Sequence, residues 1–119
     1  MSELTIYHLK TCSTCKRIIN ELTLPSQTKL KCIKEIPLRL NELEKMRELS
    51  GSYESLFSKR SQKYKALGLK EKILSEEELK NLILKEYTFL KRPVFVFEEE
   101  IYVGNSKKTI ASLKENKNL

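Results

Sequence analysis

Long apolar runs, cysteine and histidine are all scarce in this sequence of 119 residues. No apolar run approaches the roughly 18 residues that cross a bilayer, so we expect no membrane-spanning helix. Residues 1–3 lead directly into a strand-like segment without a basic and apolar leader, so export is not expected. The three cysteines are an odd number without framework spacing, which fits a reducing compartment. We therefore expect a cytoplasmic protein.

Charge is out of balance, because 23 lysine and arginine residues outnumber 16 aspartate and glutamate residues and leave a net charge of +7. Such an excess could steer anions, acidic partners or nucleic acid toward the surface. The lysines are scattered along the chain, and no ladder of aromatic residues accompanies them. A lysine-rich solvated face therefore explains most of the excess, and the charge is informative only where a base lies beside a cysteine.

The most informative motif is Cys12-Ser13-Thr14-Cys15, which stands between a strand-like segment at 4–8 and a helix-like segment at 16–22. Two thiols three residues apart in the first turn of a helix lie on one face and can reach each other. Backbone N–H groups at a helix start favour negative charge, so the pKa of Cys12 should be lowered. The motif therefore predicts redox or thiol-nucleophile chemistry.

Zinc binding and an inert structural pair are the alternatives for these two cysteines. Zinc normally takes four ligands, and the only further candidates are Cys32 and His8. Cys32 is best explained as a buried residue of a strand, with a distant resolving thiol as the alternative. His8 is either a hydrogen-bonded residue at a strand end or a group that tunes the thiolate. We expect no metal site.

The remaining pattern alternates strands and helices around a long helical stretch. Ser75 and Glu78 have the spacing of a capping box, and Asn41 with Glu44 has it as well. A proline followed by an apolar run at 93–97 indicates a buried central strand. The predicted strands are 4–8, 30–36, 92–97 and 101–103, and the predicted helices are 16–22, 41–49, 53–60, 75–87 and one after Ser106.

The order is β-α-β, helices over about 41–88, and then β-β-α. We expect one α/β domain over 1–119 with a mixed four-stranded sheet and an all-helical insertion at about 41–88. Without the insertion, this is the thioredoxin or glutaredoxin arrangement. In that arrangement, Pro93 is expected in the cis form beside the cysteine pair.

The sequence resembles the arsenate reductase-like (ArsC and Spx) branch of the thioredoxin superfamily. The matching pieces occur in order and cover nearly the whole chain. They are residues 6–8 before Cys12, Phe57-Ser58-Lys59-Arg60-Ser61, residues 64–69, Leu90-Lys91-Arg92-Pro93-Val94, and Val103-Gly104.

The resemblance implies that Cys12 is the nucleophile and that Arg60 and Arg92 line its pocket. In the arsenate reductases a third arginine follows the final hairpin, where this chain has Lys107, so either a lysine substitutes or the role is absent. His8 is a further candidate near the oxyanion. Cys15 stands where arsenate reductases carry serine and Spx-type proteins carry a second cysteine, and we expect it to be the resolving thiol.

The resemblance leads to three hypotheses about function. The first is an arsenate reductase-like thiol-disulfide oxidoreductase with no bound cofactor, reset by glutathione, glutaredoxin or a thioredoxin-type donor. The second is a Spx-type redox-sensing regulator that binds RNA polymerase. The third is a glutathione-dependent protein that reduces mixed disulfides without arsenate. A monomer that acts on a small thiol or oxyanion, away from membranes, is expected.

Overall fold

The computed structural model describes residues 3–119, which form two compact units. One unit combines the N-terminal segment up to Ile36 with Arg92–Leu119, and the other is Pro37–Lys91. That the whole chain is one domain with a helical insertion stays a prediction. No helix within residues 3–119 is both long and apolar enough to cross a membrane.

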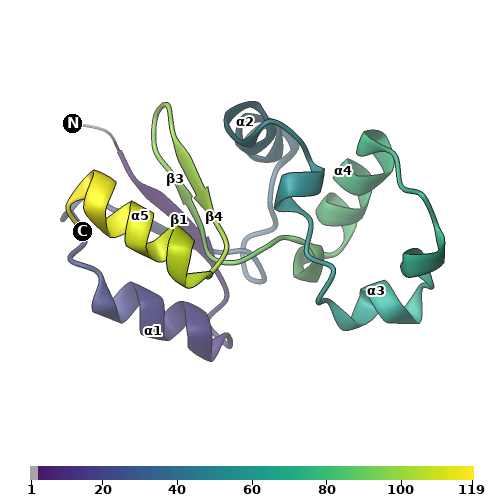
Figure 1. The fold of residues 1–119 in the computed structure, drawn as a ribbon, viewed down its shortest axis with the longest axis horizontal. Helices are drawn as coiled ribbons and strands as arrows, with labels where there is room; N and C mark the ends of the chain where they lie inside the picture. The colour runs from purple at the N-terminus through teal and green to yellow at the C-terminus, as the bar shows by residue number, and fades with distance from the viewer. Residues whose placement is uncertain (1–2) are drawn as a thin grey trace. The chain divides into compact units, whose positions relative to one another are not determined.

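The first unit contains a four-stranded sheet with strand order β2-β1-β3-β4 (Figure 1). β1 pairs in parallel with β2 and antiparallel with β3, which in turn pairs antiparallel with β4. The predicted mixed four-stranded sheet of an α/β fold is therefore confirmed. The bounds are β1 Thr5–His8, α1 Ser13–Glu21, β2 Lys29–Cys32, β3 Val94–Val96, β4 Ile101–Val103 and α5 Lys107–Lys117.

The core of this unit lies between one face of the sheet and the two helices α1 and α5, which run side by side in Figure 1. Ile6 and Phe95 are opposite each other in β1 and β3, and both are fully buried. Ile18 from α1 and Ile110 from α5 belong to the same apolar cluster. Burial of these side chains fixes α1, and therefore the cysteine motif at its start, against the sheet.

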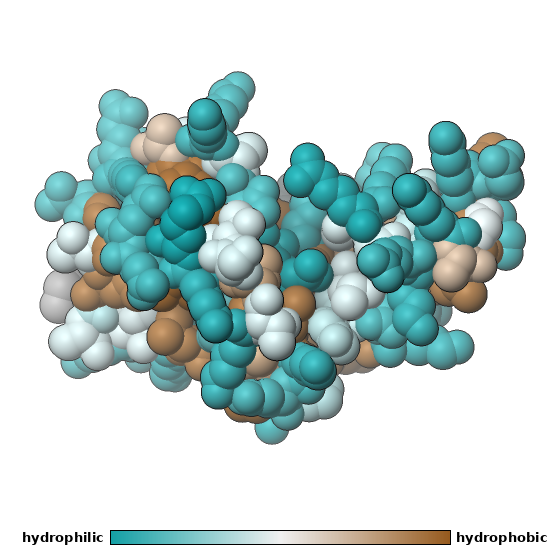
Figure 2. Space-filling view, turned by 90° about the horizontal axis from the view of Figure 1, so that it is seen from below, coloured by the Kyte–Doolittle hydropathy of each residue, from teal (hydrophilic) through white to brown (hydrophobic). Residues whose placement is uncertain are grey.

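The second unit is helical, as predicted. Figure 2 shows one face of the molecule, on which hydrophilic side chains predominate and apolar residues lie between them. Its best-defined helix start is the capping box of α4: Ser75 Oγ accepts from the Glu78 N–H, and the Glu78 carboxylate accepts from the Ser75 N–H. The bounds are α2 Leu40–Ser50, η1 Glu54–Leu56, α3 Gln62–Ala66, η2 Leu69–Glu71, α4 Glu76–Lys85 and η3 Tyr87–Phe89, where η marks a 3₁₀ turn.

Several predicted boundaries are wrong. The strand expected at 30–36 ends at Cys32, because β1 offers partners for four residues only, and the chain then turns as the Glu35 and Ile36 N–H groups donate to the Cys32 carbonyl. The helix expected at 41–49 begins one residue earlier, with Arg39 rather than Asn41 at the N-cap. There the Glu42 carboxylate accepts from the Arg39 N–H at 3.1 Å.

The helix expected at 53–60 is also wrong, since only Glu54–Leu56 is helical. Phe57 instead pairs with Leu90 in an isolated β-bridge, and its ring stacks on Phe89 with centroids 5.0 Å apart. A partner more than thirty residues away therefore sets the backbone here. The helix expected at 75–87 ends at Lys85, and a 3₁₀ turn follows it.

Candidate active site

The cysteine motif lies after β1, at the start of α1. Cys12 occupies the N-cap position with extended backbone, and the helix begins at Ser13. The Cys12 N–H donates to the Leu9 carbonyl at 3.1 Å, and its own carbonyl accepts from the Lys16 N–H at 3.1 Å. The thiol of Cys12 is partly exposed, whereas Cys15 is completely buried. The Cys12 thiol can therefore contact a substrate, whereas the buried Cys15 thiol cannot.

The pKa of Cys12 lies below its ordinary value. Burial alone raises it, but hydrogen bonds from the Cys15 N–H and thiol, the Arg92 charge and the Thr14 N–H lower it by more. These groups all favour the thiolate. The pKa of Cys12 is therefore lowered, as expected for a cysteine at a helix start. The main hydrogen-bond donors to its sulfur are backbone N–H groups and the thiol of Cys15.

Cys15 shows the opposite behaviour. The pKa of its thiol is raised to about 11, mainly by burial and also by the hydrogen bond and negative charge of Cys12, against a backbone hydrogen bond from Leu9 and the charge of Arg92. Its proton is therefore retained at neutral pH. The two sulfur atoms share one hydrogen bond, with Cys15 as donor and Cys12 as acceptor.

Arg92 and Pro93 belong to the same unit as the cysteines and enter β3. The Arg92–Pro93 peptide bond is cis, as predicted. The Pro93 carbonyl accepts from the Gly104 N–H at 2.9 Å, which ties the start of β3 to the end of β4. The charge of Arg92 acts on both thiols, and its Nε atom is buried. The structure therefore brings Cys12, Cys15 and Arg92 together.

The other predicted site residues belong to both units, His8 and Lys107 to the first and Arg60 to the second. His8 is buried at the end of β1, and burial together with the charge of Lys10 lowers its pKa, so the imidazole is neutral at pH 7. Lys107 is exposed in the first turn of α5. Arg60 is exposed on a turn of the helical unit before α3. The roles assigned to these three residues stay predictions.

Cys32 is the third thiol, and it is buried at the end of β2 directly opposite His8. Burial raises its pKa, but the backbone N–H groups of Lys10, Glu35 and Lys34 lower it by more. Within residues 3–119, no group of three or more His, Cys, Asp or Glu side chains could hold a metal ion. The expected burial of Cys32 in a strand is confirmed.

Sequence reasoning missed one contributor to the site and one groove in the same unit. The Thr14 N–H supports the Cys12 thiolate, but a backbone donor leaves no signal in the residue type. A groove between α1 and α5, lined by Arg17 and Lys107 among others, also escaped notice because it depends on two helices that are distant in sequence.

Known proteins show the same fold and sequence pattern. The model of the ArsC family matches residues 7–113. A protein described as a possible arsenate reductase from Streptococcus mutans is 30% identical, with 90% of this chain and 93% of that chain covered and a TM-score of 0.69. An arsenate reductase from Vibrio cholerae is 18% identical, with 93% and 97% covered and a TM-score of 0.77.

A third solved structure is an arsenate reductase (ArsC) related protein from Brucella melitensis, which is 19% identical, with 98% of this chain and 96% of that chain covered and a TM-score of 0.69. A search of curated proteins finds no match. The similarity to the solved structures confirms the predicted thioredoxin-like fold.

Proposed function

The chain belongs to the ArsC family, and from this membership we propose that it is a thiol-dependent oxidoreductase of the arsenate reductase kind with Cys12 as its nucleophile. The observation that supports this most directly is the split between the two thiols. Cys12 is accessible and has a lowered pKa, while Cys15 is buried and has a pKa of about 11. Such an arrangement separates an attacking thiolate from a thiol held in reserve.

In the first step the Cys12 thiolate attacks the substrate. With a disulfide, a sulfur–sulfur bond to Cys12 forms, and the other half of the substrate leaves as a thiolate. With arsenate, a sulfur–arsenic bond forms, and one arsenate oxygen leaves as water after taking up protons from solvent. The Arg92 charge beside the thiolate supports binding of the oxyanion. Arg60, Lys107 and His8 are the further candidates to hold it.

In the second step another thiol attacks the Cys12 sulfur. If this thiol is Cys15, it loses its proton and forms a Cys12–Cys15 disulfide. The electron pair of the broken bond goes to the leaving thiolate, or to arsenic, which becomes arsenite. Consumption of the Cys12 thiolate removes its charge and hydrogen bond, two of the causes that raise the pKa of Cys15. The resolving thiol therefore becomes more acidic once the adduct has formed, and an external thiol or redoxin resets the pair.

Turnover of the purified protein tests this proposal. Arsenate or a model disulfide is supplied with glutathione and glutaredoxin or with thioredoxin, and the wild type is compared with Cys12→Ser and Cys15→Ser. We expect Cys12→Ser to abolish turnover and Cys15→Ser to leave a mixed disulfide trapped at Cys12. Cys32→Ser is the matched control and should retain activity. Absence of turnover by the wild type with both substrates would overturn the enzyme assignment.

A second candidate function is a redox-sensing regulator that binds RNA polymerase. The specific observation in its favour is that Cys12 and Cys15 share a hydrogen bond, so the pair can report oxidation by closing a disulfide. The net charge of +7 also suits an acidic partner surface. Binding of purified RNA polymerase to the oxidised and reduced forms is the test, and equal absence of binding in both states would remove this candidate.

A further inference from the structure

The helical unit has a groove of its own, with a volume of about 410 Å³, lined by α4 and by residues 67–74. Its lining residues are Leu67, Leu69, Lys72, Leu74, Glu78, Asn81, Leu82 and Lys85. The four that belong to α4 have the i, i+3, i+4 and i+7 spacing of one helix face. One wall of the groove is therefore a single stripe along α4.

The fold itself does not use this stripe. The residues that α4 buries in the core are Leu79 and Ile83, and neither lines the groove. Leu67 is 52% exposed, and Leu74 and Leu82 are only partly buried. Covering these leucines with apolar side chains of a partner would be favourable in proportion to the area removed from water.

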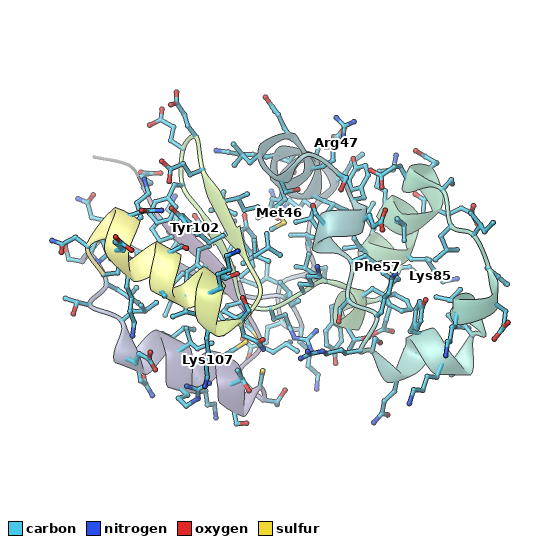
Figure 3. The ribbon with its side chains drawn as sticks, in the orientation of Figure 1. Met46, Arg47, Phe57, Lys85, Tyr102 and Lys107 are labelled. Carbon is cyan, nitrogen blue, oxygen red and sulfur yellow. The ribbon has the colours of Figure 1, made fainter. Side chains whose placement is uncertain are left out.

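The polar rim of the groove carries positive charge that no neighbour offsets. Lys72 and Lys85 are exposed, and neither forms an ion pair with an acidic side chain in residues 3–119. Figure 3 labels Lys85, which lies in the last turn of α4. Glu78 also lines the groove, but it is engaged, because the Ser75 N–H and hydroxyl donate to it at 3.2 and 3.1 Å. A complementary partner therefore carries acidic side chains beside its apolar ones.

The size of the groove and the state of its backbone favour a helix as the occupant. At roughly 30 Å³ per water-sized atom, 410 Å³ holds about fourteen heavy atoms, or about three leucine side chains. A helix presents three such side chains on one face within two turns. An extended peptide would need free backbone groups to pair with, but the walls are α4 and η2, and the Lys72 N–H after η2 already donates to the Leu69 carbonyl.

We propose that this groove docks a short amphipathic helix of a protein partner. Apolar side chains at i, i+4 and i+7 of that helix contact the leucines, and its flanking glutamate or aspartate residues pair with Lys72 and Lys85. The inference goes beyond the proposed function and does not depend on it, because Cys12 belongs to the other unit.

Binding of a designed peptide tests the proposal. The probe is a fluorescein-labelled helix of about 16 residues, acetylated and amidated, with leucine at i, i+4 and i+7 and glutamate on either side of this stripe. In the comparison peptide, lysine replaces every glutamate. Fluorescence anisotropy during titration with the full-length protein gives the Kd of each peptide. We expect the acidic peptide to bind at least about tenfold more tightly than the basic one, and added salt to weaken its binding.

Matched variants separate contacts in the groove from the general charge of the surface. Lys72→Glu should raise the Kd about threefold to tenfold, whereas Lys70→Glu makes the same charge change outside the groove and should raise it less than about twofold. Leu67→Ser should also raise the Kd about threefold to tenfold. Ile73→Ser is its control, because Ile73 is fully exposed but does not line the groove. All four side chains are exposed, so the variants should fold, and circular dichroism checks this.

Three results would overturn the docking groove. The first is no binding of the acidic peptide at about 1 mM protein. The second is an equal loss of affinity within each matched pair of variants. The third is a loss in Lys72→Glu without one in Leu67→Ser, which would indicate a purely anionic ligand such as nucleic acid. Cys12→Ser should bind the peptide as tightly as the wild type, so failure of this proposal and failure of the proposed function are distinguishable.

Discussion

Alkylation of the reduced protein at pH 8 should modify Cys12 at least about ten times faster than Cys15. With a pKa of about 11, the Cys15 thiol is roughly 0.1% ionised at that pH. A thiol at the ordinary value of 9.0 would be about 10% ionised, and Cys12 lies below that value. The thiolate populations therefore differ by at least about a hundredfold.

The higher intrinsic nucleophilicity of the Cys15 thiolate offsets part of this difference in thiolate population. A thiolate of higher pKa is the better nucleophile, and with a Brønsted slope of about 0.5 two pKa units return about tenfold to Cys15. At least about tenfold selectivity for Cys12 remains, and the complete burial of Cys15 adds a steric barrier in the same direction. The rate at Cys12 should fall as pH drops through its lowered pKa.

Iodoacetamide labelling from pH 6 to pH 10, followed by peptide mass spectrometry, measures both rates. Labelling in concentrated guanidinium is the control, because unfolding removes burial and the N–H donors and should make the thiols react alike. In Cys12→Ser the pKa of Cys15 should fall but stay raised, since burial is its largest cause. Equal labelling of the two cysteines in the folded protein, or an apparent pKa of Cys12 at or above 9.0, would refute the reasoning.

Three further predictions concern the charge of Arg92, the apolar core and the N-cap of α4. Arg92→Gln should raise the pKa of Cys12, shifting its alkylation profile to higher pH, and Arg92→Lys should restore part of the shift; an unmoved profile would contradict a charge effect. Phe95→Ala should lower the free energy of unfolding by about 3–5 kcal/mol in urea titration, because the ring is fully buried; a loss below about 1 kcal/mol would contradict its place in the core. Ser75→Ala should cost about 1 kcal/mol by the same assay through loss of the α4 cap, whereas Ser75→Asp should retain most of that stability.

Local chemistry explains which parts of the fold could be predicted from the sequence. The α4 capping box, the Ser106 cap and the buried strand after Pro93 each depend on residues within a few positions of one another, and each is observed. The backbone of residues 53–60 could not be predicted from its near neighbours. The Glu76 carboxylate accepts from the Tyr53 and Glu54 N–H groups, so a side chain more than twenty residues away determines the backbone there.

In the candidate site, too, some features could be predicted from the sequence and others could not. The thiol pair could be predicted because residue type and spacing carry the information, and the cis Pro93 was expected from the thioredoxin arrangement. The support that Cys12 receives from the Thr14 N–H could not, because every residue except proline offers the same donor. Lys107 was expected from family resemblance, but its place in a groove depends on how α1 and α5 pack.

The split of the first unit across the sequence has a consequence for biosynthesis. Cys12 and Cys15 leave the ribosome early, but Arg92 and β3, the second neighbour of β1, follow only after the 55 residues of Pro37–Lys91. At bacterial or eukaryotic elongation rates those residues take roughly 3 to 11 seconds to synthesise. During that interval β1 has an open edge toward the missing β3, and the emerging thiols lack the Arg92 charge. The nucleophile therefore gains its full set of supporting groups only when the C-terminal quarter of the chain has been made.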